Sequence, residues 1–447
     1  MAIIDFKKIW DDNEDDFLKL LSIPSTYDEK TISKAFPYGE NIALALDFMK
    51  EKCQSIGLKV QEFDGQAISA SVGRGKRIDI VSHLDVVKPG AGWDSNPFNP
   101  ISNNKEIIAR GSQDMKSGAW LTYLCFKILK DQNVDINKEL RLVYGTDEER
   151  TMNDMRYYID KAGYPDFAFT PDGTFPITTG EKGALMWIIK GQYEGNIVSL
   201  QGGVQPNVIS PYAKAEVKNI DKQKVLDLLS LYQYQAKVSE LEDKISIEII
   251  GKAGHASRPE HGENANVYLL HILSELLQED SLKKLYQVFK SPYGEGTSLF
   301  FDIKPMGKLT LNPGLISIKN NEFTMYVDCR YPYGVSSKTL NSLLQNNLQD
   351  FEISLPYDDE PTYVDDEDVY IKALKNAYTK VTNDPCPSMI SGGVSYSKVF
   401  KHCVAFGPVY LSNPMAHQKN EAILKEDLYK ALEIYYYSLL NILEGVK

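Results

Sequence analysis

Short apolar runs that each stop at a polar residue constrain the fold of this chain more than any other feature. Such runs cover residues 77–87 (RIDIVSHLDVV), 139–146 (ELRLVYGT) and 166–170 (DFAFT). Their length and continuity are typical of strands that are buried on both faces of a sheet. A segment with helical periodicity, residues 114–130, lies between the first two runs. Strands that alternate with helices predict βαβ units, so we expect an α/β domain with a mostly parallel, helix-covered sheet.

The sequence pattern changes after Gly183 and changes back beyond residue 357. Residues 244–250 (KISIEII) and 322–327 (EFTMYV) alternate apolar and polar side chains, which predicts half-exposed strands of a second, α+β domain. We interpret the acidic stretch 357–368 as a solvated loop and helix start. We therefore expect one domain inserted into another, with the boundaries 1–182, 183–357 and 358–447.

Composition and charge exclude several classes of protein. With 43% hydrophobic and 25% charged residues, the 447-residue chain is typical of a globular protein. Its 49 basic and 61 acidic residues give a net charge of −12, which argues against a nucleic-acid partner. No apolar run approaches the ~18–20 residues of a membrane span. The N-terminal segment MAIIDFKKIWDDNEDDF turns acidic where a signal peptide is apolar, so we expect no membrane partner.

The cysteines indicate a compartment. Their number is odd and no two of them form a CxxC pair, which predicts reduced thiols and neither a disulfide framework nor a zinc site. We therefore expect a cytoplasmic protein. The five cysteines are Cys53, Cys125, Cys329, Cys386 and Cys403.

Polar residues that suit metal binding or catalysis occur at five places in the sequence. Four of these places end a predicted strand or open a helix beside one, and the fifth, at His417, lies near the C-terminus. Taken singly, each has a plain alternative: a structural hydrogen bond for His83 with Asp85, a helix cap for Asp114, and turns or structural contacts for the others. Because open α/β sheets place their sites at the carboxyl ends of strands, we expect the set to converge. It consists of His83, Asp85, Asp114, Glu148, Glu149, Asp172 and His417.

The converging set contains imidazoles and carboxylates but no sulfur. Two histidines and three of the carboxylates suit a pair of divalent ions, with Zn²⁺ first and Mn²⁺ or Co²⁺ as substitutes. These five residues are His83, Asp114, Glu149, Asp172 and His417. Such a pair would polarise a carbonyl and acidify a bridging water. Glu148 lies beside a ligand without being one, which makes it a natural general base.

The chain resembles the M20 metallopeptidases, and most closely the PepV-type dipeptidases of bacteria. The resemblance covers essentially the whole chain, because a series of segments occurs in the same order and at similar spacing. The segments are SHLDVV, RGSQDMKSG, GTDEE, FTPDGTFPITTGEKG, GKAGHASRPEHGENA, KLTLNPG, DCRYP, SGGVSYSKVF and AHQKNEA.

The resemblance implies a role for each residue at the strand ends. It assigns Asp85 to the orientation of a metal-bound histidine and Glu148 to the general base. It also implies a cis peptide bond between Asp114 and Met115. The implied metal ligands are His83 and Asp172 for one ion, Glu149 and His417 for the other, and Asp114 as the bridge.

The inserted domain becomes a lid in this resemblance. His255 would approach the scissile carbonyl and help to stabilise the oxyanion, and Arg330 would hold the substrate carboxylate. The other expected substrate-binding residues are Asn207, Gly392, Gly393 and Ser395.

Outside the lid, the chain departs from the family pattern at Asp154, because relatives often carry a glycine there.

The implied activity is metal-dependent hydrolysis of dipeptides or short peptides with a free N-terminus, by a bridging water that two metal ions and a glutamate activate. Two alternatives stay open: an N-acyl amino acid amidohydrolase with the same metal pair, and a catalytically silent binding protein on the same scaffold. A serine hydrolase is excluded because the chain has no GxSxG elbow. The insertion of ~175 residues is large enough for a domain of its own. It resembles an enlarged lid that serves one chain alone, so we expect a monomer.

Overall fold

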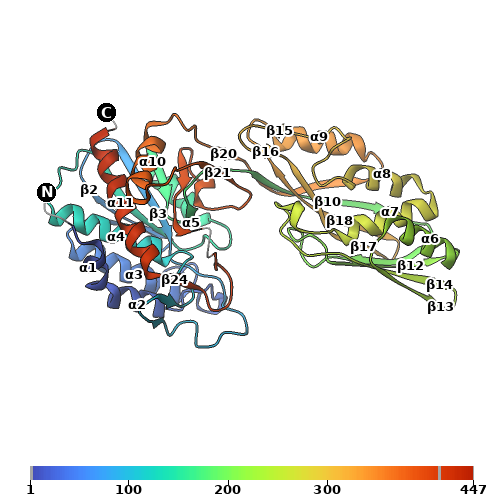
Figure 1. The fold of residues 1–447 in the computed structure, drawn as a ribbon, viewed down its shortest axis with the longest axis horizontal. Helices are drawn as coiled ribbons and strands as arrows, with labels where there is room; N and C mark the ends of the chain where they lie inside the picture. The colour runs from blue at the N-terminus through green and yellow to red at the C-terminus, as the bar shows by residue number, and fades with distance from the viewer. Residues whose placement is uncertain (1–3, 411–413, 446–447) are drawn as a thin grey trace. The chain divides into compact units, whose positions relative to one another are not determined.

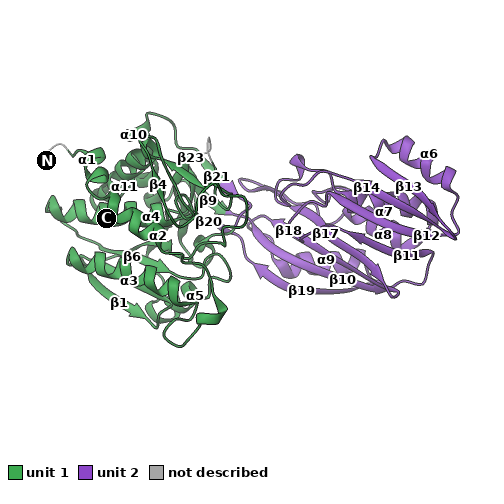
Figure 2. Ribbon diagram, turned by 90° about the horizontal axis from the view of Figure 1, so that it is seen from below, with its two compact units in different colours: residues 1–180, 363–389, 394–447 green, residues 181–362, 390–393 purple. Residues whose placement is uncertain are grey.

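The computed structural model describes residues 4–410 and 414–445, which form two compact units (Figures 1 and 2). The first unit contains residues 1–180, 363–389 and 394–447, and the second contains residues 181–362 and 390–393. The second unit therefore extends beyond the expected 183–357. One reason is that β19 (Glu352–Asp359) pairs with β10 (Gly183–Gln192) as far as the pair of Asp359 with Ala184. Residues 390–393 join this unit, where the Gly392 carbonyl accepts a hydrogen bond from Arg330.

A mixed sheet organises the first unit. Its strand order is β1-β2-β6-β3-β7-β22-β9-β20, with β21 beside β9. The central strands β6, β3, β7 and β22 are parallel, as the alternation of strands and helices predicts. The β1–β2 edge is antiparallel because only three residues join these strands, which is too few for a parallel crossover. The strands are β1 (Lys59–Phe63), β2 (Ala67–Val72), β3 (Arg77–His83), β6 (Glu139–Gly145), β7 (Phe167–Thr170), β9 (Ile177–Glu181), β20 (Thr362–Tyr363), β21 (Ser388–Ser391) and β22 (Cys403–Ala405).

Helices cover both faces of this sheet, so β3 is buried along almost its whole length. Ile78 and Ile80 pack into a core shared with helices α1–α4, α10 and α11, whereas Val81 points to the other core, with α5 and the turn η3. The helices are α1 (Phe6–Asp11), α2 (Glu14–Ser22), α3 (Glu40–Ser55), α4 (Lys116–Asp131), α5 (Asn153–Ala162), α10 (Val369–Thr382) and α11 (Lys425–Gly445), and the 3-10 turns are η1 (Glu29–Thr31) and η3 (Tyr396–Lys398). Short strands complete the unit: β4 (Ile101–Ser102), β5 (Glu106–Ile108), β8 (Gly173–Phe175), β23 (Pro408–Tyr410) and β24 (Ala422–Leu424).

The second unit is an antiparallel sheet with helices packed against it, which is the α+β architecture that the alternating segments predict. The strand order is β13-β14-β12-β11-β17-β18-β10-β19. Apolar side chains of the sheet and the helices form one separate core. The long strands besides β10 and β19 are β11 (Ile197–Gly202), β12 (Tyr212–Lys218), β13 (Ala236–Leu241), β14 (Lys244–Ile250), β17 (Thr310–Lys319) and β18 (Glu322–Tyr331). The remaining elements are α6 (Lys222–Tyr232), α7 (Ala265–Leu277), α8 (Asp280–Phe289), α9 (Ser337–Asn347), the turn η2 (Pro259–His261), β15 (Asp302–Ile303) and β16 (Gly307–Lys308).

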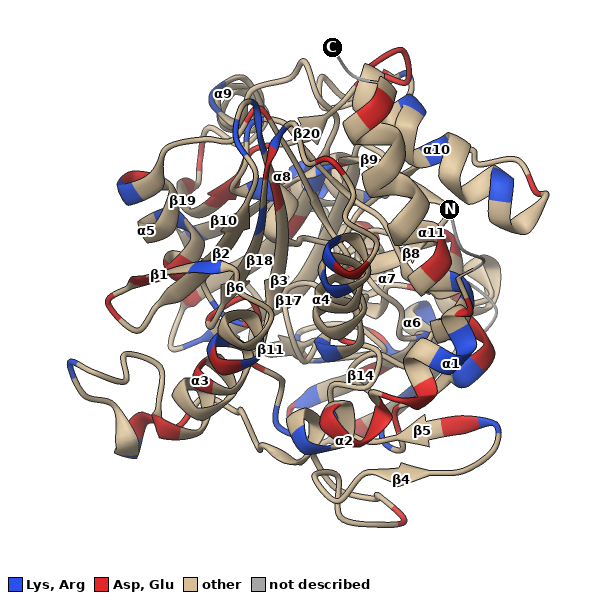
Figure 3. Cartoon of the chain, turned by 90° about the vertical axis from the view of Figure 1, so that its left-hand side faces the viewer, with Lys and Arg blue, Asp and Glu red and all other residues tan. Residues whose placement is uncertain are grey.

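Charged side chains of both signs are interspersed on the exposed helices. Figure 3 shows basic and acidic residues side by side on α1, where Lys7 pairs with Asp11 and Lys8 pairs with Asp12. Within residues 4–410 and 414–445, no helix combines the length and the apolar character that a membrane crossing requires.

Candidate active site

The candidate residues of the first unit lie where its parallel strands end. His83 is the last residue of β3, Glu148 and Glu149 follow β6, and Asp172 follows β7. These strands are adjacent in the order β6-β3-β7, so their carboxyl ends meet at one edge of the sheet. Asp114 comes just before α4, and His417 lies in the loop before β24. The structure thus brings together residues that are up to 334 positions apart in the chain.

Asp114 lies between the two histidines. Its Oδ1 atom is 3.1 Å from Nε2 of His83, and its Oδ2 atom is 3.0 Å from Nε2 of His417. The same nitrogen of His417 lies 3.0 Å from Oε2 of Glu149. Each oxygen of one carboxylate therefore faces a different imidazole.

A second group of ligand atoms surrounds His83. Nε2 of His83 is 3.7 Å from Oδ2 of Asp172 and 3.9 Å from Oε2 of Glu148. Two sets of three residues have ligand atoms within 4.8 Å of one another, namely His83 with Asp114 and Glu149, and His83 with Glu148 and Asp172. Imidazole nitrogen and carboxylate oxygen are donors that zinc and similar divalent ions take, so the residues fit the metal centre that the sequence predicts.

Asp85 contacts both His83 and the loop after β6. Nδ1 of His83 lies 2.8 Å from the main-chain carbonyl oxygen of Asp85 and 3.5 Å from its Oδ1. The carboxylate accepts hydrogen bonds from the main-chain N–H groups of Glu148 (3.3 Å) and Glu149 (3.1 Å). The main-chain oxygen thus makes the shorter contact with the ring, while the carboxylate holds the two glutamates.

The protonation of the cluster follows from its burial and its close pairs. Burial by itself would lower the pKa of His83, but its hydrogen bonds to Asp114 and Asp85 outweigh this effect and raise it well above 6.5. Hydrogen bonds to Asp114 and Glu149 raise the pKa of His417 to about 10. Burial raises the pKa of Glu148 well above 4.5, and the charge of Asp172 adds to this increase against the opposing effect of His83. Without metal ions, the cluster therefore retains protons near neutral pH.

Two features of the loop before α4 complete the geometry. The peptide bond between Asp114 and Met115 is cis, as the resemblance predicts. The carboxylate of Glu421, which is fully buried, accepts hydrogen bonds from Nη1 of Arg110 (2.6 Å) and from the main-chain N–H groups of Gly111 (3.1 Å), Gln113 (2.7 Å) and Asp114 (3.1 Å). Glu421 follows His417 by four residues, so it joins the two loops that carry Asp114 and His417.

Sequence reasoning did not identify Glu421 as part of the site. The available signal was an acidic residue directly before the apolar segment AIL, together with Arg110, since a buried arginine needs a buried acid. Pairing the two would have required knowing that residues 311 positions apart meet.

Asp154, the departure from the family pattern, also supports the loop after β6. Its carboxylate accepts hydrogen bonds from the main-chain N–H of Asp147 (3.0 Å), from the N–H of Thr146 and from the hydroxyl of Tyr396. Burial, with the charge of Asp85, raises the pKa of Asp154 to about 7. The residue lies behind the loop that carries the glutamates and fixes its backbone.

The candidate lid residues lie in the second unit. The carbonyl of Asn207 accepts a hydrogen bond from the N–H of Ala256, so it lies beside the His255 segment. Arg330 donates from Nε and Nη2 to the two carboxylate oxygens of Asp328 (2.9 and 2.7 Å) and from Nη1 to the carbonyl of Gly392 (3.0 Å). Gly393 belongs to the same short segment, residues 390–393.

Ser395 stands apart from these residues. It belongs to the first unit, is buried, and its hydroxyl accepts a hydrogen bond from the N–H of Ser397 at the start of η3. The structure therefore gives this serine a helix-capping contact.

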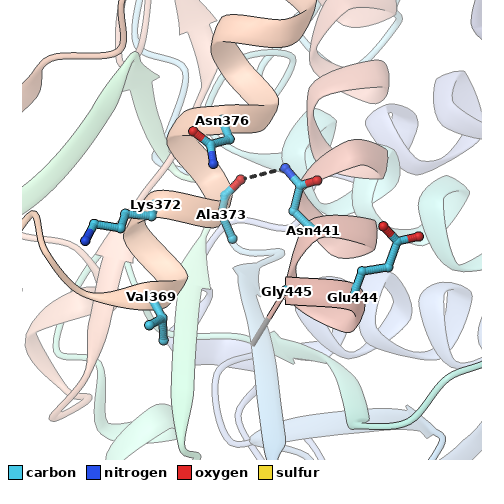
Figure 4. Close-up of a pocket in the computed structure, with 7 residues that line it drawn as sticks. All are labelled: Val369, Lys372, Ala373, Asn376, Asn441, Glu444 and Gly445. Carbon is cyan, nitrogen blue, oxygen red and sulfur yellow. Dashed lines mark hydrogen bonds between the residues drawn. The ribbon is translucent and has the colours of Figure 1, made fainter. Parts of the chain in front are cut away.

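A pocket on the first unit contains none of these residues. It lies between α10 and α11, where Nδ2 of Asn441 donates to the carbonyl of Ala373 (3.0 Å; Figure 4). Its lining is Val369, Lys372, Ala373, Asn376, Asn441, Glu444 and Gly445. This set has no cluster of ligands, so we assign it no chemistry.

The fold and the cluster at the strand ends define a class of protein: an α/β protein with an inserted α+β unit, whose parallel strands end at histidines and carboxylates that fit a divalent-metal centre. A model of "Peptidase family M20/M25/M40" matches residues 80–441. A relative from Staphylococcus aureus (strain MRSA252), named "Putative dipeptidase SAR1836", is 31% identical over 96% of this chain and 96% of its own. The chain therefore belongs to the M20/M25/M40 peptidase family, and it is a hydrolytic enzyme of that metal-dependent family.

Solved structures share the fold at much lower sequence identity. The dipeptidase Dug1p from Saccharomyces cerevisiae has a TM-score of 0.60 and 15% identity, covering 99% of this chain and 98% of its own. Human carnosine dipeptidase 1 has a TM-score of 0.59 and 13% identity, with 98% of both chains covered. These likenesses concern the arrangement of both units' elements and carry no information on substrate.

Proposed function

We propose that this protein is a dipeptidase that uses two divalent metal ions, with Zn²⁺ first, to hydrolyse dipeptides or short peptides with a free N-terminus. The observation that carries the proposal is the position of Asp114, whose two oxygens lie 3.1 and 3.0 Å from nitrogens of His83 and His417. A carboxylate that faces two separate ligands in this way is suited to bridge two ions. The name of the S. aureus relative supports the substrate class.

In this proposal the ligand set divides into two halves around one carboxylate. When bound, the ions would supply Lewis acidity to the scissile carbonyl and lower the pKa of a water molecule. Five residues would hold them: His83 and Asp172 on one side, Glu149 and His417 on the other, and Asp114 between.

Glu148 would act as the general base. Its side chain is almost fully buried, and its Oε2 lies 3.9 Å from Nε2 of His83, beside the proposed metal centre. The carboxylate of Asp85 accepts a hydrogen bond from the main-chain N–H of Glu148 and so fixes the backbone from which the Glu148 side chain extends. Once positive charge neutralises the neighbouring carboxylates, the pKa of Glu148 would fall. Its ionised carboxylate could then take a proton from the attacking water and pass that proton to the leaving amine.

The second unit would recognise the rest of the substrate. His255 would donate a hydrogen bond to the oxyanion. Arg330 has five N–H groups, and its contacts with Asp328 and Gly392 engage three of them, so two N–H groups would be available for the substrate carboxylate. Asn207, Gly392 and Gly393 of the second unit are proposed to line the same substrate site, and Ser395 is the one proposed substrate-binding residue from the first unit.

We also infer a monomer in the cytoplasm. The second unit has its own sheet and its own apolar core, so it has the size of a separate domain, as expected of a lid that serves one chain. All five cysteines are buried, and none of them forms a disulfide in the described part of the chain, which fits a reducing compartment.

A substrate comparison tests the proposed function. Zinc-loaded protein is offered a free dipeptide, the same dipeptide with an acetylated N-terminus, and the corresponding N-acetyl amino acid. We expect hydrolysis of the free dipeptide with a kcat/KM at least ~100-fold above the other two, since a site that pairs a substrate N–H group discriminates strongly against its loss. Preference for either acylated compound would replace the dipeptidase proposal with an acyl amidohydrolase, and no turnover of any substrate would indicate a binding protein.

A further inference from the structure

The side chain of Ser257 lies against the ring of His255. The main-chain N–H of Ser257 donates to Nδ1 of His255 at 3.2 Å, and the hydroxyl oxygen of Ser257 lies 2.7 Å from the same nitrogen. A main-chain N–H can only donate, so Nδ1 must be the acceptor and carries no proton. In the neutral ring the single proton is then on Nε2.

The backbone around His255 is held independently of this contact. The N–H of Ile209 donates to the carbonyl of Gly254 (2.8 Å), and the N–H of Ala256 donates to the carbonyl of Asn207 (2.9 Å). His255 also forms an isolated antiparallel β-bridge with Val208. The position of the residue is therefore set by the segment 207–209, whereas the orientation of its ring is set by Ser257.

Gly392 provides the space that Ser257 occupies. A Cβ atom added at Gly392 would lie 2.4 Å from Cβ and 2.8 Å from Oγ of Ser257, closer than real side chains approach. The carbonyl of Gly392 is itself held by Arg330. Any side chain at residue 392 would therefore clash with Ser257 and force its side chain to shift.

From these contacts we infer that Ser257 is a positioning residue that fixes His255 in the tautomer with its proton on Nε2, the form that can donate to an oxyanion. This inference rests on the proposed function, in which His255 stabilises that oxyanion. The tautomer matters because the opposite form would present an acceptor nitrogen to a negatively charged oxygen, which would be repulsive.

The charges near His255 favour the neutral ring. Partial burial, with the positive charges of Arg330 and Arg258, lowers the pKa of His255, against the opposing charge of Asp328. A neutral ring has one proton to place, so the choice of nitrogen that Ser257 imposes is decisive near neutral pH.

The test combines nitrogen NMR with kinetics on the full, zinc-loaded chain labelled with ¹⁵N-histidine. The signals of His255 are identified by their loss in the His255→Ala variant. At pH 8 we expect the wild-type ring to show a protonated Nε2 and an unprotonated Nδ1. Ser257→Ala keeps the main-chain N–H but removes the hydroxyl, and with it the shorter of the two contacts with Nδ1. We therefore expect part of the His255 rings to shift to the other tautomer, giving a mixture, and a kcat for a free dipeptide about tenfold lower, the order of magnitude of one hydrogen bond, at similar KM.

Ser257→Thr is the matched control, because it keeps the hydroxyl, and it should retain both the tautomer and most of the activity. Gly392→Ala should reproduce the tautomer mixture of Ser257→Ala, since it displaces the same side chain. A wild-type ring protonated on Nδ1, or a Ser257→Ala variant with an unchanged tautomer or an unchanged kcat, would overturn the inference. Failure of the proposed function would be distinct: the wild-type protein would not hydrolyse dipeptides, whatever the tautomer of His255.

Discussion

Glu148 and Glu149 are adjacent in the chain but face different partners. Oε2 of Glu149 lies 3.0 Å from the ring of His417, whereas Oε2 of Glu148 lies 3.9 Å from that of His83. We expect Glu148→Gln to retain two metal ions and to lose about 10²–10⁴-fold in kcat, because an amide cannot take a proton. The matched variant Glu149→Gln should bind metal more weakly. Metal analysis and kinetics of both proteins check the assignment, and loss of metal from Glu148→Gln alone would reverse it.

The protons on His417 make metal binding depend on pH. In the metal-free protein, hydrogen bonds to Asp114 and Glu149 raise the pKa of His417 from 6.5 to about 10. The stability that this shift gives the metal-free fold is fully present below pH 6.5 and is lost as the pH rises through 10. A histidine must be neutral to bind a metal, so zinc binding at pH 8 should release its proton, and the affinity should rise with pH.

Calorimetric titration of the metal-free protein with Zn²⁺ measures this release. The experiment is repeated at pH 8 in two buffers that differ in ionisation enthalpy, with His417→Ala as the control. We expect the control to release about one proton fewer than the wild-type protein. Equal proton release by the two proteins would show that His417 is already neutral.

At the scale of elements, the loop before α4 depends on Glu421. Replacing Glu421 with Gln would put an amide NH₂ group against N–H donors and leave the charge of buried Arg110 without its partner. Loss of one partner from a buried ion pair costs about 3–5 kcal/mol. We expect Glu421→Gln to lower the free energy of unfolding by about that amount and to weaken metal binding, since the loop carries Asp114.

Chemical denaturation of the metal-free protein and a zinc titration test the role of Glu421. Glu426→Gln is a matched control from the same segment, because Glu426 is exposed and pairs only at the surface with Lys430 in the described part of the chain. The control should change little in either measurement. A Glu421→Gln variant as stable as the control would contradict the role assigned to this contact.

The elements also show what a sequence can predict. The apolar runs at 77–87, 139–146 and 166–170 predicted β3, β6 and β7, because a strand buried on both faces leaves a continuous apolar pattern. The alternating segment 244–250 coincides with β14 for the corresponding reason, burial of one face. The antiparallel edge of the sheet and residues 390–393 of the second unit were not predicted, since pairing between distant segments leaves no local pattern.

The same limit applies to the candidate site. Four of the five proposed metal ligands end or follow a strand or open a helix, which a sequence pattern can reveal, whereas His417 lies in a loop before β24. Glu421 and Ser257 are different. The partners of Glu421 lie 307–311 residues away in the chain. The partner of Ser257 is the ring of His255, whose orientation only the fold defines. Their importance comes from their contacts in the folded chain, which the spacing of apolar residues in the sequence does not predict.

At the scale of the whole molecule, we predict that one chain is sufficient for activity. Mixing His255→Ala protein with Glu148→Gln protein should give no recovery of dipeptide hydrolysis, because each monomer would lack one essential group. In an assembly whose lids act on a partner, the mixed pairs would contain one intact site. Recovery of activity on mixing would therefore contradict the monomer.

The central claim is that five ligands from distant parts of the chain form one centre for two metal ions. Native mass spectrometry of the metal-free protein during zinc titration, with dipeptide hydrolysis measured on the same samples, tests this claim most directly. We predict two zinc ions per chain and a rate that follows the fraction of chains with both sites filled. Full activity with a single ion per chain, in the presence of excess zinc, would contradict the account.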